Sequence, residues 1–451
     1  MPKKKTALTI EERLQQALVP AEEQPYEVPE NWVWVRLGEV TKVVGGGTPS
    51  TSKKEYYDEG NISWLSPVDL SNYNGIYISR GNKMITLEGL NNSSAKLLPK
   101  DTVCLTSRAP IGYVAIAEKE LCTNQGFKSF LPSPTYLAKF LYWYLKGNKE
   151  LLKSKASGTT FLELSASKAA TIEFPLPPLS EQQRIVERIE ELFAKLDEAK
   201  ERLQEAADSF AVRKAAILHK AFTGELIGKQ VTELVPLENL VDLIKIGPFG
   251  SSLHESDYIE NGIPLVNPKH IVQQRIVPQS KISISDEKAE ELSSYKLKEN
   301  DIVLGRRGEM GRCAPISNRE ENWICGTGSM IIRLKKEYDA KLYSLILGSQ
   351  ATVTYLENSA VGSTLKNLNE KIVRKIPVPQ FSSEEQHEIV RLIDDLLARE
   401  RKAQQAAEQA LASIELMKKS ILARAFRGEL GTNKASEASA LELLRLLEFQ
   451  P

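Results

Sequence analysis

Arginine, amide and hydroxyl side chains recur in short glycine-containing loops of this 451-residue chain, and these residue types could recognise DNA. One loop, residues 106–112, reads TSRAPIG, and its counterpart, residues 305–312, reads GRRGEMGR. An arginine at a strand end can bond a guanine edge through two nitrogens or grip a phosphate, whereas amides suit adenine. A lone surface arginine is usually only solvated. The paired occurrence at equivalent places nevertheless favours a functional role.

The candidate DNA-binding residues lie in loops that occur in both halves of the chain. Two are glycine loops, residues 45–50 (GGGTPS) and 247–252 (GPFGSS), and another matching pair is residues 124–128 and 326–329. A further pair, Gly158-Thr159-Thr160 and Gly362-Ser363-Thr364, occurs in the same register as the rest of the repeat. The candidates are Thr48, Ser50, Ser107, Arg108, Asn124, Gln125, Lys128, Thr159, Thr160, Ser251, Ser252, Arg306, Arg307, Arg312, Ser329, Ser363, Thr364 and Lys366.

Signatures of catalysis are missing from the sequence. It has no Walker A loop, no GxGxxG, GxSxG or HExxH, and its one Pro-Pro pair stands between leucines rather than before an aromatic residue. The four cysteines and four histidines are scattered, so we expect neither a metal site nor disulfides, and a reducing cytoplasm fits. No apolar run is long enough to span a membrane. Net charge is zero, which neither indicates nor excludes nucleic acid. An undetected nuclease or other enzyme remains the alternative.

A long helix that occurs twice must position these loops. Residues 179–226 superpose on residues 383–430 without a gap when the sequence is shifted by about 204 residues. Each copy has an apolar residue every three or four positions, which is typical of a coiled-coil seam. The predicted seam residues are Ile185, Ile189, Leu192, Leu196, Leu203, Phe210, Ile389, Ile393, Leu396, Ile414 and Ile421, and the same register includes Met417 and the charged Glu400. A plain dimerisation rod is the simpler interpretation, and the globular segment before each helix argues against it.

The sequence therefore predicts an α+β chain with an internal repeat. Two similar globular domains would be separated by two long helices that form an antiparallel coiled coil with a pseudo-twofold axis. The expected boundaries are 1–27 for an N-terminal segment with a short helix, 28–178 for domain 1, 179–227 for helix 1, 228–380 for domain 2, 381–430 for helix 2 and 431–451 for a tail helix. The tail helix is expected to dock near the N-terminus. Such a geometry suits a reader of two DNA half-sites.

At this point the chain resembles the specificity subunit of type I restriction-modification systems over nearly its whole length. The glycine loops at Gly45 and Gly247, the PLPPLSEQ junction at residues 175–182 and the two helix ends of the form AFxGEL support the resemblance. The second junction departs, with Pro379-Gln380-Phe381 in place of Pro-Pro-Leu, which puts only the helix entry in doubt.

The resemblance implies a non-catalytic subunit that reads a bipartite, asymmetric sequence in double-stranded DNA, with one target-recognition domain for each half. It implies two modification subunits as partners, which bind S-adenosylmethionine and methylate adenine, and restriction (motor-nuclease) subunits that use ATP and Mg. No cofactor is expected in this chain. The alternative from another class is a coiled-coil scaffold whose globular domains bind protein. A module normally fused to an enzyme is a third option, and the chain is expected to be complete as it stands.

Overall fold

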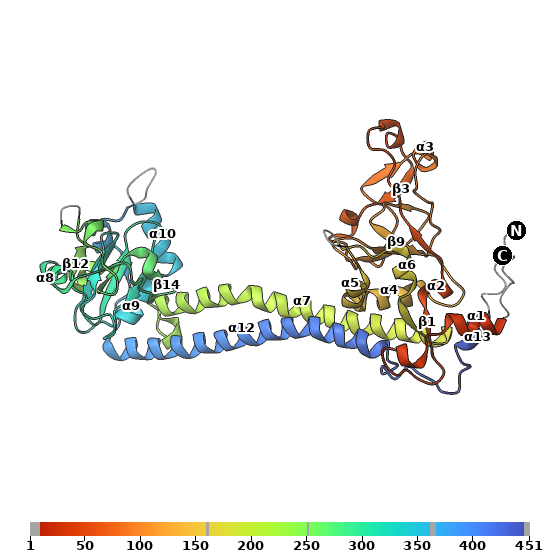
Figure 1. Ribbon diagram of the computed structural model, residues 1–451. Coiled ribbons are helices and arrows are strands. Elements are labelled where there is room, and N and C mark those ends of the chain that lie inside the picture. The colour runs from red at the N-terminus through yellow and green to blue at the C-terminus, as the bar shows by residue number, and fades with distance from the viewer. Residues whose placement is uncertain (1–9, 159–161, 250–251, 361–366, 446–451) are drawn as a thin grey trace. The chain divides into compact units, whose positions relative to one another are not determined.

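The computed structural model describes residues 10–158, 162–249, 252–360 and 367–445, and it divides the chain into two compact units. Unit 1 comprises Met1–Glu201 and Leu411–Pro451, and unit 2 comprises Arg202–Ala410. Each unit contains one globular part and portions of two long helices, α7 (Leu179–Thr223) and α12 (Ser383–Ala425) (Figure 1). The two units therefore have the same make-up, in agreement with the repeat predicted from the sequence.

The globular part of unit 1 is built on a sheet with the strand order β2-β9-β6-β7-β4, in which neighbours are antiparallel except β4 and β7. A smaller sheet, β5-β3-β8, and the pair β1–β10 complete it. The strands are β1 (Val33–Arg36), β2 (Val43–Gly45), β3 (Ile62–Leu65), β4 (Tyr77–Ile78), β5 (Lys83–Ile85), β6 (Val103–Thr106), β7 (Val114–Ala117), β8 (Cys122–Thr123), β9 (Phe127–Phe130) and β10 (Glu173–Leu176). The helices are α1 (Ile10–Ala17), α2 (Leu37–Val40), α3 (Leu87–Asn91), α4 (Ala138–Gly147), α5 (Lys149–Lys155) and α6 (Ala166–Ala170).

In the part of the chain that the structure describes, the globular part of unit 2 repeats most of this topology, without a counterpart of β4 and with an added pair, β14–β15. Its main sheet has the order β12-β20-β17-β18, which corresponds to β2-β9-β6-β7, and its second sheet, β16-β13-β19, corresponds to β5-β3-β8. The strands are β11 (Val235–Pro236), β12 (Val241–Ile246), β13 (Ile263–Val266), β14 (Ile271–Val272), β15 (Arg275–Ile276), β16 (Ser283–Ile284), β17 (Asp301–Gly305), β18 (Cys313–Pro315), β19 (Ile324–Cys325), β20 (Ser329–Leu334) and β21 (Pro377–Val378). The helices are α8 (Asp286–Glu291), α9 (Ala340–Leu347), α10 (Gln350–Ser359) and α11 (Glu370–Arg374).

Each globular part shares its hydrophobic core with the start of one long helix and the end of the other. In unit 1, Ile185 and Ile189 of α7 belong to the same buried cluster as Phe426, which follows α12. The Phe426 ring lies 5.2 Å from Phe140 and 5.1 Å from Tyr144, both on α4, as measured between ring centroids. In unit 2, the corresponding cluster unites the start of α12 with the end of α7 through Ile389, Ile393 and Ala221. Apolar burial of this kind holds each globular part to the helices.

A buried glutamine at the start of each long helix fixes the direction in which the helix leaves its globular part. The Gln182 amide donates to the carbonyls of Thr135 (3.0 Å) and Pro177 (2.9 Å), and its oxygen accepts from Leu137 N (2.8 Å). Gln386 makes the matching set in unit 2: its amide donates to the carbonyls of Glu337 (2.9 Å) and Phe381 (3.0 Å), and its oxygen accepts from Asp339 N (2.7 Å). The altered junction at residues 379–381 therefore keeps the same helix entry.

Both long helices end earlier than the sequence suggested, at Thr223 and Ala425 rather than at Leu226 and Leu430. Gly224 and Gly428 adopt positive φ values of 81° and 74°, a left-handed conformation that commonly ends a helix. The ungapped match between the two helix copies continues through these glycines, and sequence similarity does not reveal their backbone conformation.

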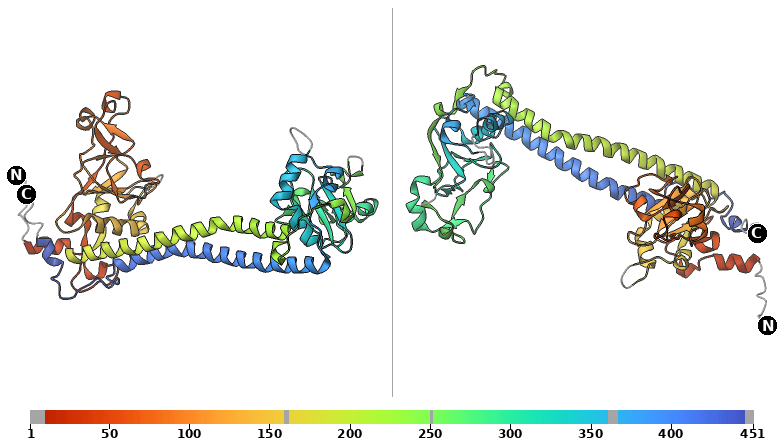
Figure 2. Two further views of the ribbon diagram at one scale, coloured as in Figure 1. Left: turned by 180° about the vertical axis from the view of Figure 1, so that it is seen from behind. Right: turned by 90° about the horizontal axis from the view of Figure 1, so that it is seen from above.

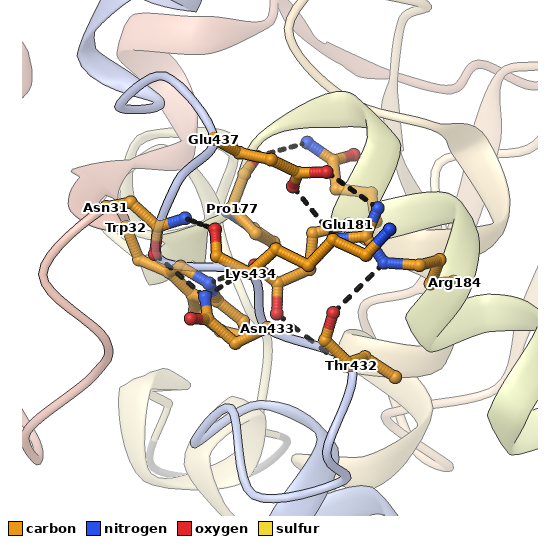
Figure 3. A network of polar contacts seen from close by, with 10 residues as sticks. Asn31, Trp32, Pro177, Glu181, Arg184, Thr432, Asn433, Lys434 and Glu437 are labelled. Carbon is orange, nitrogen blue, oxygen red and sulfur yellow. Dashed lines mark hydrogen bonds and ion pairs between the residues drawn. The ribbon is translucent and has the colours of Figure 1, made fainter.

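The segment after α12 returns to the start of α7 in unit 1, where it forms a polar network (Figure 3). The fully buried Glu181 carboxylate accepts from Trp32 Nε1 and from Asn433 Nδ2, each at 2.8 Å. Arg184 forms a two-nitrogen ion pair with Glu437 at 2.9 Å and 2.8 Å. Bidentate, charge-assisted contacts are stronger than ordinary hydrogen bonds. They hold the tail against the start of α7.

The expected docking of the tail near the N-terminal segment is confirmed. Ala440 N donates to Asn31 O at 2.9 Å, and α13 (Leu441–Arg445) buries Leu444 in the core of unit 1. In unit 2, Lys229 pairs with Glu385 at 2.8 Å, and these residues are the repeat equivalents of Asn433 and Glu181. The tail therefore covers the start of α7. In the same way, the segment that follows α7 covers the start of α12.

Portions of α7 and α12 lie side by side within each unit (Figure 2). The eleven predicted seam residues are all buried or partly buried. Met417 differs, because half of its surface is exposed. Its neighbour Lys418 points inward instead, with Nζ 5.1 Å from the Phe193 ring centroid and an ion pair to Asp197. A helix of 3.6 residues per turn drifts from a 3.5-residue pattern, so the seam can shift by one position along its length.

We expect Gln182→Ala to lower the free energy of unfolding by about 2–4 kcal/mol, because two buried carbonyls and one buried N–H lose their partner. Urea denaturation measures this change. Gln183→Ala is the matched control: that side chain is exposed, so its effect should stay within about 0.5 kcal/mol. Equal losses for the two variants would show that the buried amide does not anchor the helix.

Candidate nucleic-acid interface

Four polar residues meet where β6 ends, and we call Ser107, Arg108, Lys128 and Glu163 the β6 corner. The backbone sets their positions: Ser107 N donates to Gly126 O at 2.7 Å, and Leu164 N donates to Ser107 O at 2.8 Å. An isolated β-bridge joins Arg108 to Glu163. These bonds bring the loop after β6, the start of β9 and the segment before α6 together at the ends of two inner strands of the main sheet.

The Glu163 carboxylate joins the two cations of the β6 corner. It contacts Arg108 Nη2 at 3.0 Å and Lys128 Nζ at 3.2 Å, and Lys128 Nζ also donates to Ser107 Oγ at 3.3 Å. The Lys128 side chain is only 10% exposed, whereas that of Arg108 is 45% exposed. Burial by itself would raise the pKa of the Glu163 carboxyl, but the hydrogen bonds from Arg108 and Lys128 outweigh it and lower that pKa. The carboxylate is therefore ionised at neutral pH.

Unit 2 builds the same frame at the end of β17, where Arg306, Arg307 and Asn367 form the β17 corner. Arg306 N donates to Gly328 O at 3.0 Å, Leu368 N donates to Arg306 O at 2.9 Å, and a β-bridge joins Arg307 to Asn367. Arg306 thus stands where Ser107 stands in unit 1, Arg307 where Arg108 stands, and Asn367 where Glu163 stands. The backbone is the same and the side chains differ.

The two arginines of the β17 corner have different environments. Arg306 is only 5% exposed, its Nε donates to Asn367 Oδ1 at 3.1 Å, and its guanidinium carbon lies 5.1 Å from the Phe249 ring centroid. Its burial, and secondarily the charge of Arg307, lower the pKa of the Arg306 guanidinium. Arg307 is exposed. Burial and stacking orient the first arginine, and the second is accessible to a partner.

The glycine loops lie beside the loops that follow β8 and β19. A Cβ added to Gly46 would lie 1.9 Å from Asn124 O, and one added to Gly247 would lie 2.1 Å from Gly326 O, so both positions require glycine. This close approach lets the Thr48 hydroxyl hydrogen-bond the Gln125 side chain. The structure thereby unites two loops that the sequence analysis proposed separately.

A buried histidine supports the loop after β19. Gly328 N donates to Asn267 Oδ1 at 3.4 Å, and His270 Nδ1 lies 2.8 Å from Leu265 O and 3.2 Å from Asn267 N. His270 is 1% exposed, and this burial lowers the pKa of its imidazole below the ordinary value of 6.5.

The candidates from the sequence differ in accessibility. Ser50, Arg108, Gln125, Ser252 and Arg307 are exposed; Thr48, Asn124 and Arg312 are partly buried; and Ser107, Lys128, Arg306 and Ser329 are buried. Ser329 is buried because it starts β20 opposite Gly305, within the sheet. Thr159, Thr160, Ser251, Ser363, Thr364 and Lys366 lie outside the described residues. The DNA contacts themselves stay a prediction.

Sequence reasoning missed Glu163 and Asn367. Each follows a loop that had been singled out, at Gly158-Thr159-Thr160 and at Gly362-Ser363-Thr364, and each occupies the same place in the 204-residue repeat. The repeat could have shown that Glu163 in the first half is replaced by Asn367 in the second. Their role became visible only once the fold placed them opposite Arg108 and Arg306.

Within the ranges that the structure describes, no three histidine, cysteine, aspartate or glutamate side chains are grouped so as to hold a metal ion. The cysteines, Cys104, Cys122, Cys313 and Cys325, are buried and free. None of the described helices has the length and apolarity that a membrane span requires.

Comparison with known proteins agrees with this architecture. The family described as type I restriction modification DNA specificity domain matches the chain twice, over residues 29–207 and 238–409. The chain belongs to this family. It is 35% identical over 298 residues to the type I restriction enzyme MjaIX specificity subunit of Methanocaldococcus jannaschii, a match that covers 63% of this chain and 68% of that one. We therefore call the two globular parts specificity domain 1 and specificity domain 2.

Solved structures share the fold of this specificity chain. An HsdS subunit from Thermoanaerobacter tengcongensis aligns with a TM-score of 0.64 and 20% identity, over 90% of this chain and all (100%) of that one. A chain from a structure on complex assembly and conformational transition of the type I R-M system aligns with a TM-score of 0.61 and 21% identity, over the same shares of 90% and 100%. The duplicated sheets and long helices are thus a fold already found in specificity subunits.

We expect specificity domain 2 to lose stability as the pH falls below about 6.5, because the unfolded chain then binds a proton that the buried His270 takes up only at lower pH. The melting temperature measured between pH 7.5 and pH 5.5 tests this. His270→Asn, which does not titrate, should flatten the dependence. The exposed His219→Asn is the control and should leave it unchanged. Equal slopes in all three proteins would contradict a neutral buried imidazole.

Proposed function

We propose that this chain is the DNA sequence-specificity subunit of a type I restriction-modification complex. Each specificity domain would read one half of a bipartite, asymmetric site in double-stranded DNA, while α7 and α12 set the spacer between the halves. Family membership supports the assignment of the chain to such a system.

The observation that supports this function most directly is the exchange of side chains at the two corners. Ser107 and Arg306 occupy one backbone position, and Glu163 and Asn367 occupy another, with matching hydrogen bonds around them. A reader of two different half-sites needs this combination, because base contacts specify sequence while the frame keeps them in register.

We further propose that α7 and α12 form one antiparallel coiled coil with a pseudo-twofold axis. The ion pairs support it. As residue numbers rise along α7, from Lys200 to Arg213, the partner numbers fall along α12, from Glu415 (3.1 Å) to Glu400 (2.9 Å). Arg213 also lies over the Phe210 ring, with 4.4 Å from its guanidinium carbon to the ring centroid. Glu400, the one charged residue predicted for the seam, thereby has a partner that favours this register.

We propose that the chain itself is not catalytic and holds no cofactor. Two modification subunits would dock on the helices and bind S-adenosylmethionine for adenine methylation, and restriction subunits would supply the ATP- and Mg-dependent motor and nuclease. The duplicated helices support two equivalent docking surfaces, since a repeated surface suits two copies of one partner.

We expect that exchanging residues 28–178 for the corresponding domain of another specificity subunit changes one half-site and leaves the other half and the spacer unchanged. The reason is that Gln182 and the α7 start stay in place and hold the new domain. Adenine methylation mapped across the genome of cells that express the variant with its modification subunits measures the result.

A change in both half-sites would contradict independent reading by the two domains. A gel-shift assay with and without modification subunits tests DNA binding itself. The wild-type chain should retard DNA when its modification subunits are present. Binding of the globular domains to protein, without any DNA shift in either condition, would favour the scaffold alternative.

A further inference from the structure

The two corners carry different charge on one backbone frame. In the β6 corner, Arg108 and Lys128 share one carboxylate, so two positive charges face one negative charge. In the β17 corner, Arg306 and Arg307 face the neutral amide of Asn367. Met330 occupies the strand position that Lys128 occupies, since they pair with the equivalent residues Leu304 and Leu105. The two corners therefore have the same number of positive charges, but only the β6 corner also has a negative charge.

A carboxylate beside an exposed arginine changes what that arginine can bind. A phosphate brought to Arg108 would also approach the ionised Glu163, and like charges repel at this range. A guanine edge presents two neutral acceptors, O6 and N7, which a guanidinium can bond without bringing a second anion. The ion pair also restricts the rotamers of Arg108, so less conformational entropy is lost on binding.

The lysine makes the carboxylate a rigid support. Lys128 is 8% exposed and holds the other oxygen of Glu163, and it is tied in turn to Ser107 Oγ. Glu163 therefore cannot easily rotate away to release Arg108. Within the described residues, no carboxylate contacts the side chains of the β17 corner, and Arg307 is exposed at the position equivalent to Arg108.

We propose that Glu163 is a specificity-determining positioning residue of domain 1, which holds Arg108 for a base edge with two acceptors, as in guanine, and disfavours phosphate. This inference rests on the proposed DNA-reading function. In domain 2, the asparagine at the equivalent place leaves Arg307 available to phosphate. Specificity and electrostatic affinity are thus divided unequally between the two corners.

The test uses the complex of the specificity and modification subunits and DNA duplexes containing the site mapped for the wild type. Binding is measured for every single-base change in the first half-site and across a salt series. Glu163→Gln should lose roughly tenfold discrimination at one base pair and should steepen the slope of log K against log salt by about one, because Arg108 becomes free to contact phosphate.

Asn367→Asp is the converse variant. It places a carboxylate at the β17 corner, and we expect weaker binding to all sequences with a slope shallower by about one, as one phosphate contact is lost. Glu173→Gln is the matched control, because it removes a carboxylate that lies outside the β6 corner. That carboxylate pairs with Lys155, at 2.8 Å from its Nζ. The control should change neither discrimination nor slope.

Unchanged discrimination and slope in Glu163→Gln would overturn the inference while leaving the proposed function intact. An even loss over the whole half-site would also overturn it, since Glu163 would then only support the fold. If Glu163→Gln does not assemble, Asn367→Asp decides alone: an unchanged slope there would contradict the charge argument. A wild-type complex without any sequence preference would overturn the proposed function itself, and this inference with it.

Discussion

The architecture depends on one side-chain amide, which occurs twice. Gln182 and Gln386 each use both ends of the amide to bond three backbone groups at the junction between a globular part and a long helix. Both side chains are almost fully buried, so no water can replace these bonds. A long helix transmits any error in its starting direction to its far end. The anchor therefore matters more for the placement of the domains than its small size suggests.

This constraint explains how the chain separates constant from variable parts. Four strands of the main sheet, the second sheet and the helix anchors correspond in the two domains, whereas the corners exchange serine for arginine and glutamate for asparagine. Because the backbone frame at the corners is held by its own hydrogen bonds, the side chains can change without moving it. Recognition can thus diverge while the scaffold persists, which suits a protein whose two halves read different sequences.

Much of the fold follows from the sequence. A 204-residue repeat and a heptad pattern suffice to find both long helices and both globular parts, because periodicity and duplication are global signals. Local conformation does not follow as well: the helices end at Thr223 and Ala425, and Lys418 rather than Met417 turns toward Phe193. The candidate site follows only in part. Glu163 lies 35 residues from Lys128 in the chain, and their contact depends on tertiary structure that no local pattern reveals.

We propose that the paired helices measure the distance between two independently read half-sites. Inserting one heptad into α7 between Ala199 and Ala206, and one into α12 between Ala410 and Ile414, preserves the seam phase and lengthens each helix by about 10 Å. Genome-wide mapping of adenine methylation, in cells that express this variant with its modification subunits, gives the outcome directly. We expect unchanged half-sites separated by a spacer that is longer by at most about three base pairs. Active methylation with the original spacer would contradict it.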